Sequence, residues 1–339
     1  MTKVVHGFVM VDAWGSALNN AGLQPSERTE NIVRTKVFWR ERQAYPYVSG
    51  QSWRFWWRST LADKMGWKLS PISREAKIAY TEANPIAYPD DDIFGYMRAP
   101  KGKKDAEGKK TPSETLTRLS VLKNSCLVSV GPQRPTEDFG TFSRFEGDPV
   151  PYEHEFYSTV LKGIFSLDVE SAGVFKTMAT AGSRNLPEDF KIPKEYAQKC
   201  KQVDRVFVLD RAIRIQRISD ALSAIPHLSG GAMLARNLSR VAPSLIVLGA
   251  YSTGSHIFSH LATTKNDAAY FNTGALNQVL SDYESDRLTK VYIGREEGFM
   301  DSVNDDLSSL AKKHGGKVIV GSVASAVRGF CQEIPSLVA

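Results

Sequence analysis

The residues best suited to bind an anionic ligand lie in residues 45–58, YPYVSGQSWRFWWR. On a helix with about 100° per residue, Gln51, Arg54 and Arg58 fall within a sector of about 60°, and the tryptophans fill the opposite side. Ser49 is a suitable N-cap, so the free N–H groups of the first turn would also face a phosphate. The pattern predicts an amphipathic helix with an aromatic anchor and a narrow cationic stripe.

A core helix with an ordinary solvent-facing charged side is the alternative interpretation. The distribution of charge favours an anionic partner. The whole chain has 43 Lys and Arg against 37 Asp and Glu, a net charge of +6. Residues 28–64 alone carry eight basic and three acidic residues, and residues 98–110 and 199–217 each carry six and two. Clustered positive charge of this kind indicates a partner such as nucleic acid.

Motifs for catalysis are incomplete. Gly249 and Gly254 have the spacing of a phosphate-binding loop, but Ser255 stands where that loop needs lysine. His256 and His260 would share one helix face, yet the residue after the first histidine is isoleucine rather than the glutamate of a metalloprotease. The sequence therefore predicts a protein that is not an enzyme and that uses no metal and no other cofactor.

The acidic triplet Asp90, Asp91 and Asp92 keeps one catalytic alternative open. Adjacent carboxylates can hold Mg²⁺ when the fold or a phosphate supplies further ligands. The other interpretation of the triplet is a solvated loop that pairs with basic residues. A metal site at these residues is thus an alternative to a pure binding function.

Composition limits the class of protein. The chain has 339 residues, of which 42% are hydrophobic and 24% charged, which is typical of one or two globular domains. The longest clear apolar run, residues 245–251, is far short of the roughly 18 residues that span a bilayer. Asp12 interrupts the apolar N-terminal stretch, which is unlike a signal peptide. The three cysteines form no CxxC pair, so we expect a cytoplasmic protein without membrane contact.

Periodicity and turn signals predict the elements that position these residues. Residues 15–30 are expected to be a loop, and Gly163 to be a bulge. The longest elements give the order βαββαβ, which is that of ferredoxin-like and RRM-like α+β folds. The expected elements are strands over 4–10, 121–130, 156–169 and 245–251, a helix from Ser49 to Gly66, a helix over 210–224, and alternating helices and strands over 274–321.

The segment YPYVSGQSWRFWWR also resembles the signature region of a known family. This is the RNA-binding backbone subunit of type I CRISPR effector complexes, the Cas-seven family in its DevR-like branch (type I-A or I-B-like). Residues 92–97, DIFGYM, resemble the family's LFGRM-like segment, although Tyr96 replaces the usual basic residue. Residues 118–130 and 155–168 resemble its middle strands, and residues 230–243 its glycine loop. The resemblance spans about residues 1–255.

The resemblance implies an RRM-like palm with inserted fingers and a thumb. The palm would comprise residues 1–65 and 118–255, the fingers 66–117, the thumb 170–205, and residues 256–339 would be a C-terminal extension. In the family, copies stack along one guide crRNA as a helical filament and present it for pairing with target DNA in antiviral defence. Because base pairing reads the sequence, the protein would bind the RNA backbone without sequence specificity. Further partners would be other Cascade subunits and a recruited nuclease-helicase or transposition proteins.

Family residues carried onto this chain define two sets. Two other functions stay open: a type III-like backbone subunit with metal-dependent cleavage of target RNA, and a generic single-stranded RNA-binding module. The lysine- and glycine-rich residues 101–110 are expected to be disordered in the free protein. The guide-binding set is Lys36, Arg42, Ser49, Gln51, Arg54, Arg58, Gly230, Gly231 and Arg236. The fingers set, expected near target DNA, is Phe94, Gly95, Met97, Lys101, Lys103, Lys104, Lys109 and Lys110.

Overall fold

The apolar N-terminal run forms strand β1 (Val4–Ser16) at the centre of a large sheet. The computed structural model describes residues 2–24, 32–75, 78–99, 115–143, 146–178 and 184–339. On one side β1 is antiparallel to β13 (Val150–Asp168), and on the other to β17 (Leu245–Tyr251). β13 also pairs with β10 (Leu122–Asn124) and β11 (Leu127–Ser129). The expected strands are present, and the one over 121–130 consists of two short pieces.

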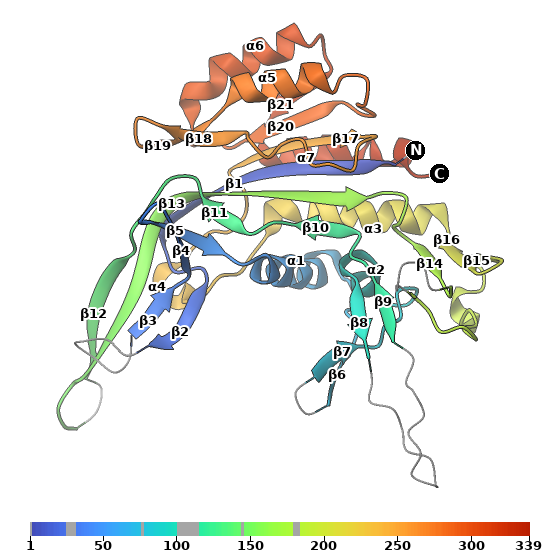
Figure 1. Ribbon diagram of the computed structural model, residues 1–339, viewed down its shortest axis with the longest axis horizontal. Coiled ribbons are helices and arrows are strands. Elements are labelled where there is room, and N and C mark those ends of the chain that lie inside the picture. Colours follow the sequence, from blue (N-terminus) through green and yellow to red (C-terminus); the bar gives the residue numbers. More distant parts are fainter. Residues whose placement is uncertain (1, 25–31, 76–77, 100–114, 144–145, 179–183) are drawn as a thin grey trace.

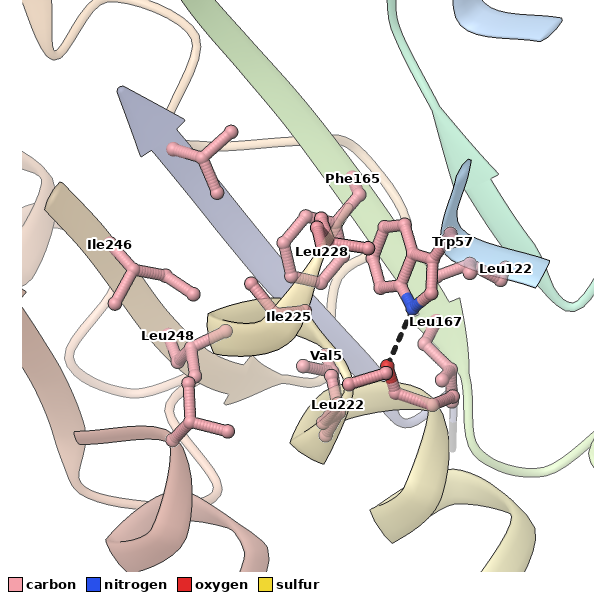
Figure 2. Packing of buried hydrophobic residues seen from close by; sticks show 14 of the residues in the cluster. Val5, Trp57, Leu122, Phe165, Leu167, Leu222, Ile225, Leu228, Ile246 and Leu248 are labelled. Atoms are coloured by element: carbon pink, nitrogen blue, oxygen red, sulfur yellow. Dashed lines mark hydrogen bonds between the residues drawn. The ribbon is translucent and has the colours of Figure 1, made fainter. Parts of the chain in front are cut away.

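Two helices cover one face of these strands. α1 (Gly50–Met65) and α3 (Arg211–Ser223) lie side by side against the sheet (Figure 1). The Trp57 indole N–H donates to the Ala221 carbonyl at 2.7 Å, which joins the two helices within a core that includes Phe165 (Figure 2). The chain is thus an α+β structure with the element order βαββαβ around its central strands.

Helix α1 begins and ends where its sequence predicts. The Ser49 hydroxyl accepts from the Ser52 N–H, and Gly66 ends the helix in the left-handed region with φ of 68°. The three tryptophans at positions 53, 56 and 57 are buried in the core. This anchor fixes which side of the helix the arginines occupy.

Two local expectations are wrong. Residues 15–30 are not simply a loop, because β2 (Asn20–Gln24) pairs with β3 (Ile32–Thr35). Gly163 is not a bulge, since it pairs with Val9 in a continuous register. A Cβ on this glycine would lie 2.6 Å from the Leu127 side chain, so close packing explains the residue.

An arm projects from the side of the sheet where β4 forms the edge. β4 (Val37–Arg40) pairs with β5 (Gln43–Val48), which pairs with β11. The outer half of β13 pairs with β12 (Thr136–Phe142) and with β3, and this arm extends away from the sheet (Figure 1).

The segment between α1 and β10 forms a second projection. It contains α2 (Pro89–Phe94), and its strands are β6 (Ile72–Glu75), β7 (Ile78–Thr81), β8 (Tyr96–Arg98) and β9 (Leu116–Arg118), arranged as two pairs below α1 (Figure 1). Nearby, a three-stranded sheet has two of its strands within the range assigned to the thumb and the third just after it. Its strands are β14 (Val174–Lys176), β15 (Cys200–Val203) and β16 (Val206–Leu209), with the turn η1 (Lys194–Tyr196) before β15.

The C-terminal region, expected as an extension, adds two strands to the same sheet. β20 (Val291–Arg295) pairs with β17, and β21 (Val318–Gly321) pairs with β20. One apolar core joins the sheet to α5 (Thr273–Asp282) and α6 (Asn304–Lys313), while α7 (Val323–Cys331) packs against α3 on the other face (Figure 1). The remaining elements are η2 (Ile225–His227), α4 (Leu234–Asn237), β18 (Ala262–Lys265), β19 (Ala268–Phe271), η3 (Asp301–Val303) and α8 (Ile334–Leu337). None of the described helices is long and apolar enough to cross a membrane.

Candidate nucleic-acid interface

Arg54 of α1 does not present a free cation to solvent. Its Nη1 donates to the Leu122 carbonyl at 2.6 Å and to Asn124 Oδ1 at 3.1 Å. Its Nη2 donates to the Phe94 carbonyl at 2.6 Å and to Ser120 Oγ at 2.9 Å. Burial lowers the pKa of Arg54 to about 10. This guanidinium therefore joins α1 to β10 and α2, and the expected phosphate contact stays a prediction.

Arg58, one turn further along α1, is shared between the protein and solvent. Its guanidinium carbon lies 4.6 Å from the centroid of the Phe94 ring, and its Nε lies 3.8 Å from Asp90 Oδ2. About a third of its side chain, 32%, is exposed. Burial lowers the pKa of Arg58, and the nearby carboxylates oppose that shift. Arg58 keeps some capacity to bind an anion, but its first partner is the segment that carries α2.

The candidate DNA contacts near α2 fall into different environments. Phe94 is 3% exposed and lies beneath two arginines, so it is corrected to a packing residue. Gly95 has φ of 72°, and a Cβ there would lie 2.4 Å from the Arg118 carbonyl, so backbone packing explains it. Met97 is 68% exposed and stays a candidate contact. Lys101, Lys103, Lys104, Lys109 and Lys110 lie outside the described residues.

The acidic triplet is buried and faces hydrogen-bond donors. Asp92 pairs with Arg118 and, at 2.8 Å, with Arg217. Asp90 accepts from the Ser70 N–H at 2.9 Å, and Asp91 accepts from an N–H in the turn before α2. Burial raises the pKa of both Asp90 and Asp91. The described residues contain no group of three or more metal-ligating side chains. Asp92 thus connects the inserted segment to α3, and the bonds to Asp90 and Asp91 lie within that segment.

The glycine pair lies under α1. Gly230 has φ of 155°, and a Cβ there would be 2.3 Å from the Trp56 ring. Gly231 has φ of 111°, and a Cβ would be 3.0 Å from Leu18. Close packing against Trp56 of α1 thus accounts for Gly230, and a positive φ with close packing against Leu18 accounts for Gly231. Arg236 is exposed, and its guanidinium lies 5.4 Å from the centroid of the Tyr152 ring on the arm.

The N-terminus of α1 is partly occupied by its own cap. The Ser49 hydroxyl accepts from the Ser52 N–H at 3.2 Å, and the Ser49 N–H donates to Asn19 Oδ1 at 2.9 Å. Gln51, in the first turn, is exposed. Ser49 therefore shapes the helix start, and Gln51 is the member of this pair whose side chain a ligand can reach.

Lys36 and Arg42 line an open groove on the edge hairpin β4–β5. A cavity of about 610 Å³ is lined by Lys36, Trp39 and Arg134, among others. A neighbouring cavity of about 380 Å³ is lined by Arg42 and again by Trp39 and Arg134. We call these four residues and the two cavities the Trp39 groove. Trp39, 65% exposed, is common to both cavities.

The charge of the Trp39 groove is positive. Four cations (Arg34, Lys36, Arg42 and Arg134) and two acids (Glu137 and Glu155) line the two cavities. Glu155 is already occupied: one oxygen pairs with Arg34 at 3.0 Å, and the other accepts from the N–H and hydroxyl of Thr35. Lys36, Arg42 and Arg134 make no ion pair within the described part of the chain. Three cations beside an exposed indole can bind phosphate and a base together.

Sequence reasoning missed Trp39 and Arg134. Trp39 stands within the basic run between Lys36 and Arg42, and an aromatic residue in such a run is a signal that could have been used. Arg134 carries no comparable signal, because it is isolated in a loop and reaches the groove only through the pairing of β5, β11 and β13.

Comparisons with known proteins give a family and a fold. The model of the family described as CRISPR-associated negative auto-regulator DevR/Csa2 matches residues 15–270. No curated protein matches the chain. A solved chain from a "CRISPR RNA-guided surveillance complex" is similar with a TM-score of 0.54 and 11% identity, over 97% of this chain and 98% of that one. Another, from a "CRISPR RNA-guided surveillance complex, pre-nicking", has a TM-score of 0.53 and 10% identity, over 98% and 100%.

Proposed function

The chain belongs to the DevR/Csa2 family of CRISPR-associated proteins, and we propose that it is the RNA-binding backbone subunit of a Cascade-type surveillance complex. The observation that carries this proposal is the likeness of fold along almost the whole of this chain and of the solved chains. We infer that the βαββαβ unit is an RRM-like palm and that residues 66–117 are its fingers. In this function the protein holds guide RNA and presents it to target DNA.

The Trp39 groove supports binding through the RNA backbone. Its three cations have no ion-pair partner among the described residues, so they are available for phosphates. Lys and Arg contacts to phosphate release counterions and do not depend on base sequence. A subunit that covers guides of any sequence needs this indifference, because base pairing supplies recognition of the target.

Binding without catalysis is the better supported of the two main alternatives. Metal-dependent cleavage would need carboxylates that are free to take a cation. The acidic triplet that raised this alternative is buried and accepts from arginines and backbone N–H groups. We therefore propose that the protein is not a nuclease.

Contacts between copies are part of the proposal. The arm exposes Phe139, Phe142 and Val150 at its outer end, and these side chains are 58%, 53% and 49% exposed. Apolar side chains on a projecting hairpin are suited to a neighbouring surface. We infer that the arm of one copy contacts a different surface of the next copy, because such a head-to-tail contact generates an open helical filament when it does not close into a ring.

The proposal is tested by assembly on RNA. Random-sequence RNAs of increasing length, analysed by native mass spectrometry, should bind protein copies in steps of a fixed number of nucleotides. The double variant Phe139→Ser with Phe142→Ser should bind each RNA as a single copy, and the number of bound copies should no longer rise with RNA length. If a single copy of the wild-type protein binds RNA of every length, the filament is wrong. If the wild-type protein binds no RNA, the proposed function is wrong.

A further inference from the structure

Trp39 differs from the other tryptophans in its surroundings. The tryptophans of α1 and Trp67 are at most 8% exposed, whereas Trp39 is 65% exposed and Trp14 is 80% exposed. Trp14 lines a separate cavity of about 220 Å³ together with Asp12 and Asp267. Trp39 instead lies between cavities that contain three unpaired cations. Of the two exposed indoles, only Trp39 combines an aromatic face with positive charge.

The turn that follows Trp39 holds an arginine in an unfavourable conformation. Glu41 and Arg42 have φ of 51° and 62°, and they connect the paired residues Arg40 and Gln43. A two-residue turn with both φ values positive strongly prefers Asn-Gly, because other side chains are strained there. The backbone of Arg42 is strained, and its side chain lines the cavity beside Trp39. Backbone strain at a ligand-facing residue is a signal of function that is independent of the charge.

The β4–β5 hairpin lies at the edge of the sheet, where Trp39 is accessible to a ligand. β4 is the edge strand of the large sheet, so the outward side of Trp39 has no neighbouring strand within the described residues. Next to it, Phe38 stacks on Tyr45 with ring centroids 5.4 Å apart and an angle of 16°, which stiffens the hairpin. A rigid, solvent-facing indole beside cations is the arrangement by which proteins stack single-stranded bases.

We propose that the Trp39 groove is a stacking subsite for one unpaired base of single-stranded RNA, with the flanking phosphates held by Lys36, Arg42 and Arg134. This inference rests on the proposed function and deepens it, since the guide would then be held by an aromatic face as well as by its phosphates. Every base has a π-face, so stacking keeps the interaction tolerant of sequence.

The test separates stacking from charge. RNA affinity is measured by fluorescence anisotropy over a series of salt concentrations with a random-sequence RNA. Trp39→Leu should weaken binding about tenfold and leave the salt dependence unchanged. Trp39→Tyr should bind nearly as the wild type does, because it retains an aromatic face. Trp14→Leu, the matched exposed tryptophan beside acids, should have no effect. Arg42→Ala with Arg134→Ala should lower the slope of log K against log salt by about 1.4.

Each other result has a defined meaning. If the wild type binds RNA and Trp39→Leu binds equally well, the stacking subsite is wrong while the proposed function stands. If the wild type binds no RNA, both are wrong. If Trp39→Leu changes the sedimentation of the RNA-free protein but not its RNA affinity, Trp39 belongs to a protein contact and the subsite is overturned. Thermal melting of Trp39→Leu close to that of the wild type shows that lost affinity is not lost folding.

Discussion

Two arginine-bearing regions of this protein differ in how available their guanidinium groups are, although Arg42 and Arg54 come from the same basic stretch of sequence. At the junction of α1 with the inserted segment, Arg54 has four protein acceptors and lies over a buried ring. In the Trp39 groove, Arg42 and Arg134 line open cavities and have no ion-pair partner among the described residues. Both regions contain arginines, but only those of the groove lack an ion-pair partner among the described residues.

The difference follows from the cost of burying charge. A guanidinium taken out of water must satisfy its N–H groups within the protein, and one that does so has little left for a ligand. A cation left unpaired beside solvent costs the fold little and keeps its electrostatic attraction for phosphate. The number of acceptors around an arginine therefore separates structural from binding arginines better than its place on a helical wheel.

The largest effect should come from the buried carboxylate that supports the first region. Asp92→Ala would leave Arg118 and Arg217 buried without their counter-charge, so we expect a loss of about 3–5 kcal/mol in the free energy of unfolding. Urea denaturation measures this loss. Asp138→Ala is the matched control: its carboxylate is about half exposed, and its contact with His154 Nε2 at 3.1 Å should be worth less than about 1 kcal/mol. Equal losses in the two variants would contradict the structural role of the junction.

The pH dependence of stability should test a buried histidine contact that lies outside both arginine regions. His256 Nε2 lies 2.9 Å from the Phe165 carbonyl and its Nδ1 accepts from the Phe258 N–H, so the neutral ring fits. Burial and the neighbouring His6 lower the pKa of His256 to about 4. The unfolded chain then binds more protons between about pH 6.5 and pH 4, so stability falls as the pH falls.

The expected loss from His256 is roughly 3 kcal/mol when the pH is lowered from 7 to 4, because about 2.5 pKa units separate the folded and unfolded states. Burial lowers the pKa of His6 as well, which adds in the same direction. Denaturation curves at several pH values should show a flatter dependence for His256→Gln. His260→Gln, with an exposed ring, should keep the wild-type dependence. A wild-type stability that rises toward pH 4 would contradict the buried neutral pair.

Removing one arginine from each region should give smaller effects, on stability in the first region and on RNA binding in the second. Arg54→Ala leaves buried acceptors without donors and should cost about 2–3 kcal/mol of stability, with the salt dependence of RNA binding unchanged. Arg134→Ala should change stability by less than about 0.5 kcal/mol and flatten the salt slope by about 0.7. Melting curves and RNA titrations of the same two variants decide. A flatter slope of log K against log salt for Arg54→Ala would mean that Arg54 contacts RNA phosphate after all.

Much of the framework around these regions could be predicted from the sequence. Local signals determine it: Ser49 and Gly66 bound α1, and continuous apolar runs mark β1 and β17. The resemblance carried by the YPYVSGQ segment led to the correct family. The environment of Arg54 could not be predicted, because a helical wheel shows which side a residue faces but not which distant segment covers that side. Here α2 and β10, about 40 and 70 residues away, cover it.

The groove was only half predictable for the same reason. Lys36 and Arg42 stand in an evident basic run, whereas Arg134 reaches them through strand pairing across about 90 residues of chain. The C-terminal region was interpreted as an extension because its elements follow the recognised pattern. Its strand β20 is nevertheless hydrogen-bonded to β17, and β21 to β20, and non-local pairing of this kind leaves little trace in a single sequence.

The smallest effect should come from relieving the backbone strain of the β4–β5 turn, which lowers the stability of the fold. Replacing Glu41 and Arg42 together by Asn and Gly gives the β4–β5 turn the residues that positive φ values favour. We expect the free energy of unfolding to rise by about 1 kcal/mol, because the strain of two left-handed residues is relieved. RNA affinity should fall at the same time, since the Arg42 guanidinium is lost. Glu41→Asn alone relieves part of the strain, keeps Arg42, and should preserve affinity. Urea denaturation and RNA titration of both variants measure the two changes. A double variant that is less stable than the wild type would mean that Arg42 supports the hairpin, and the groove would then resemble the α1 junction after all.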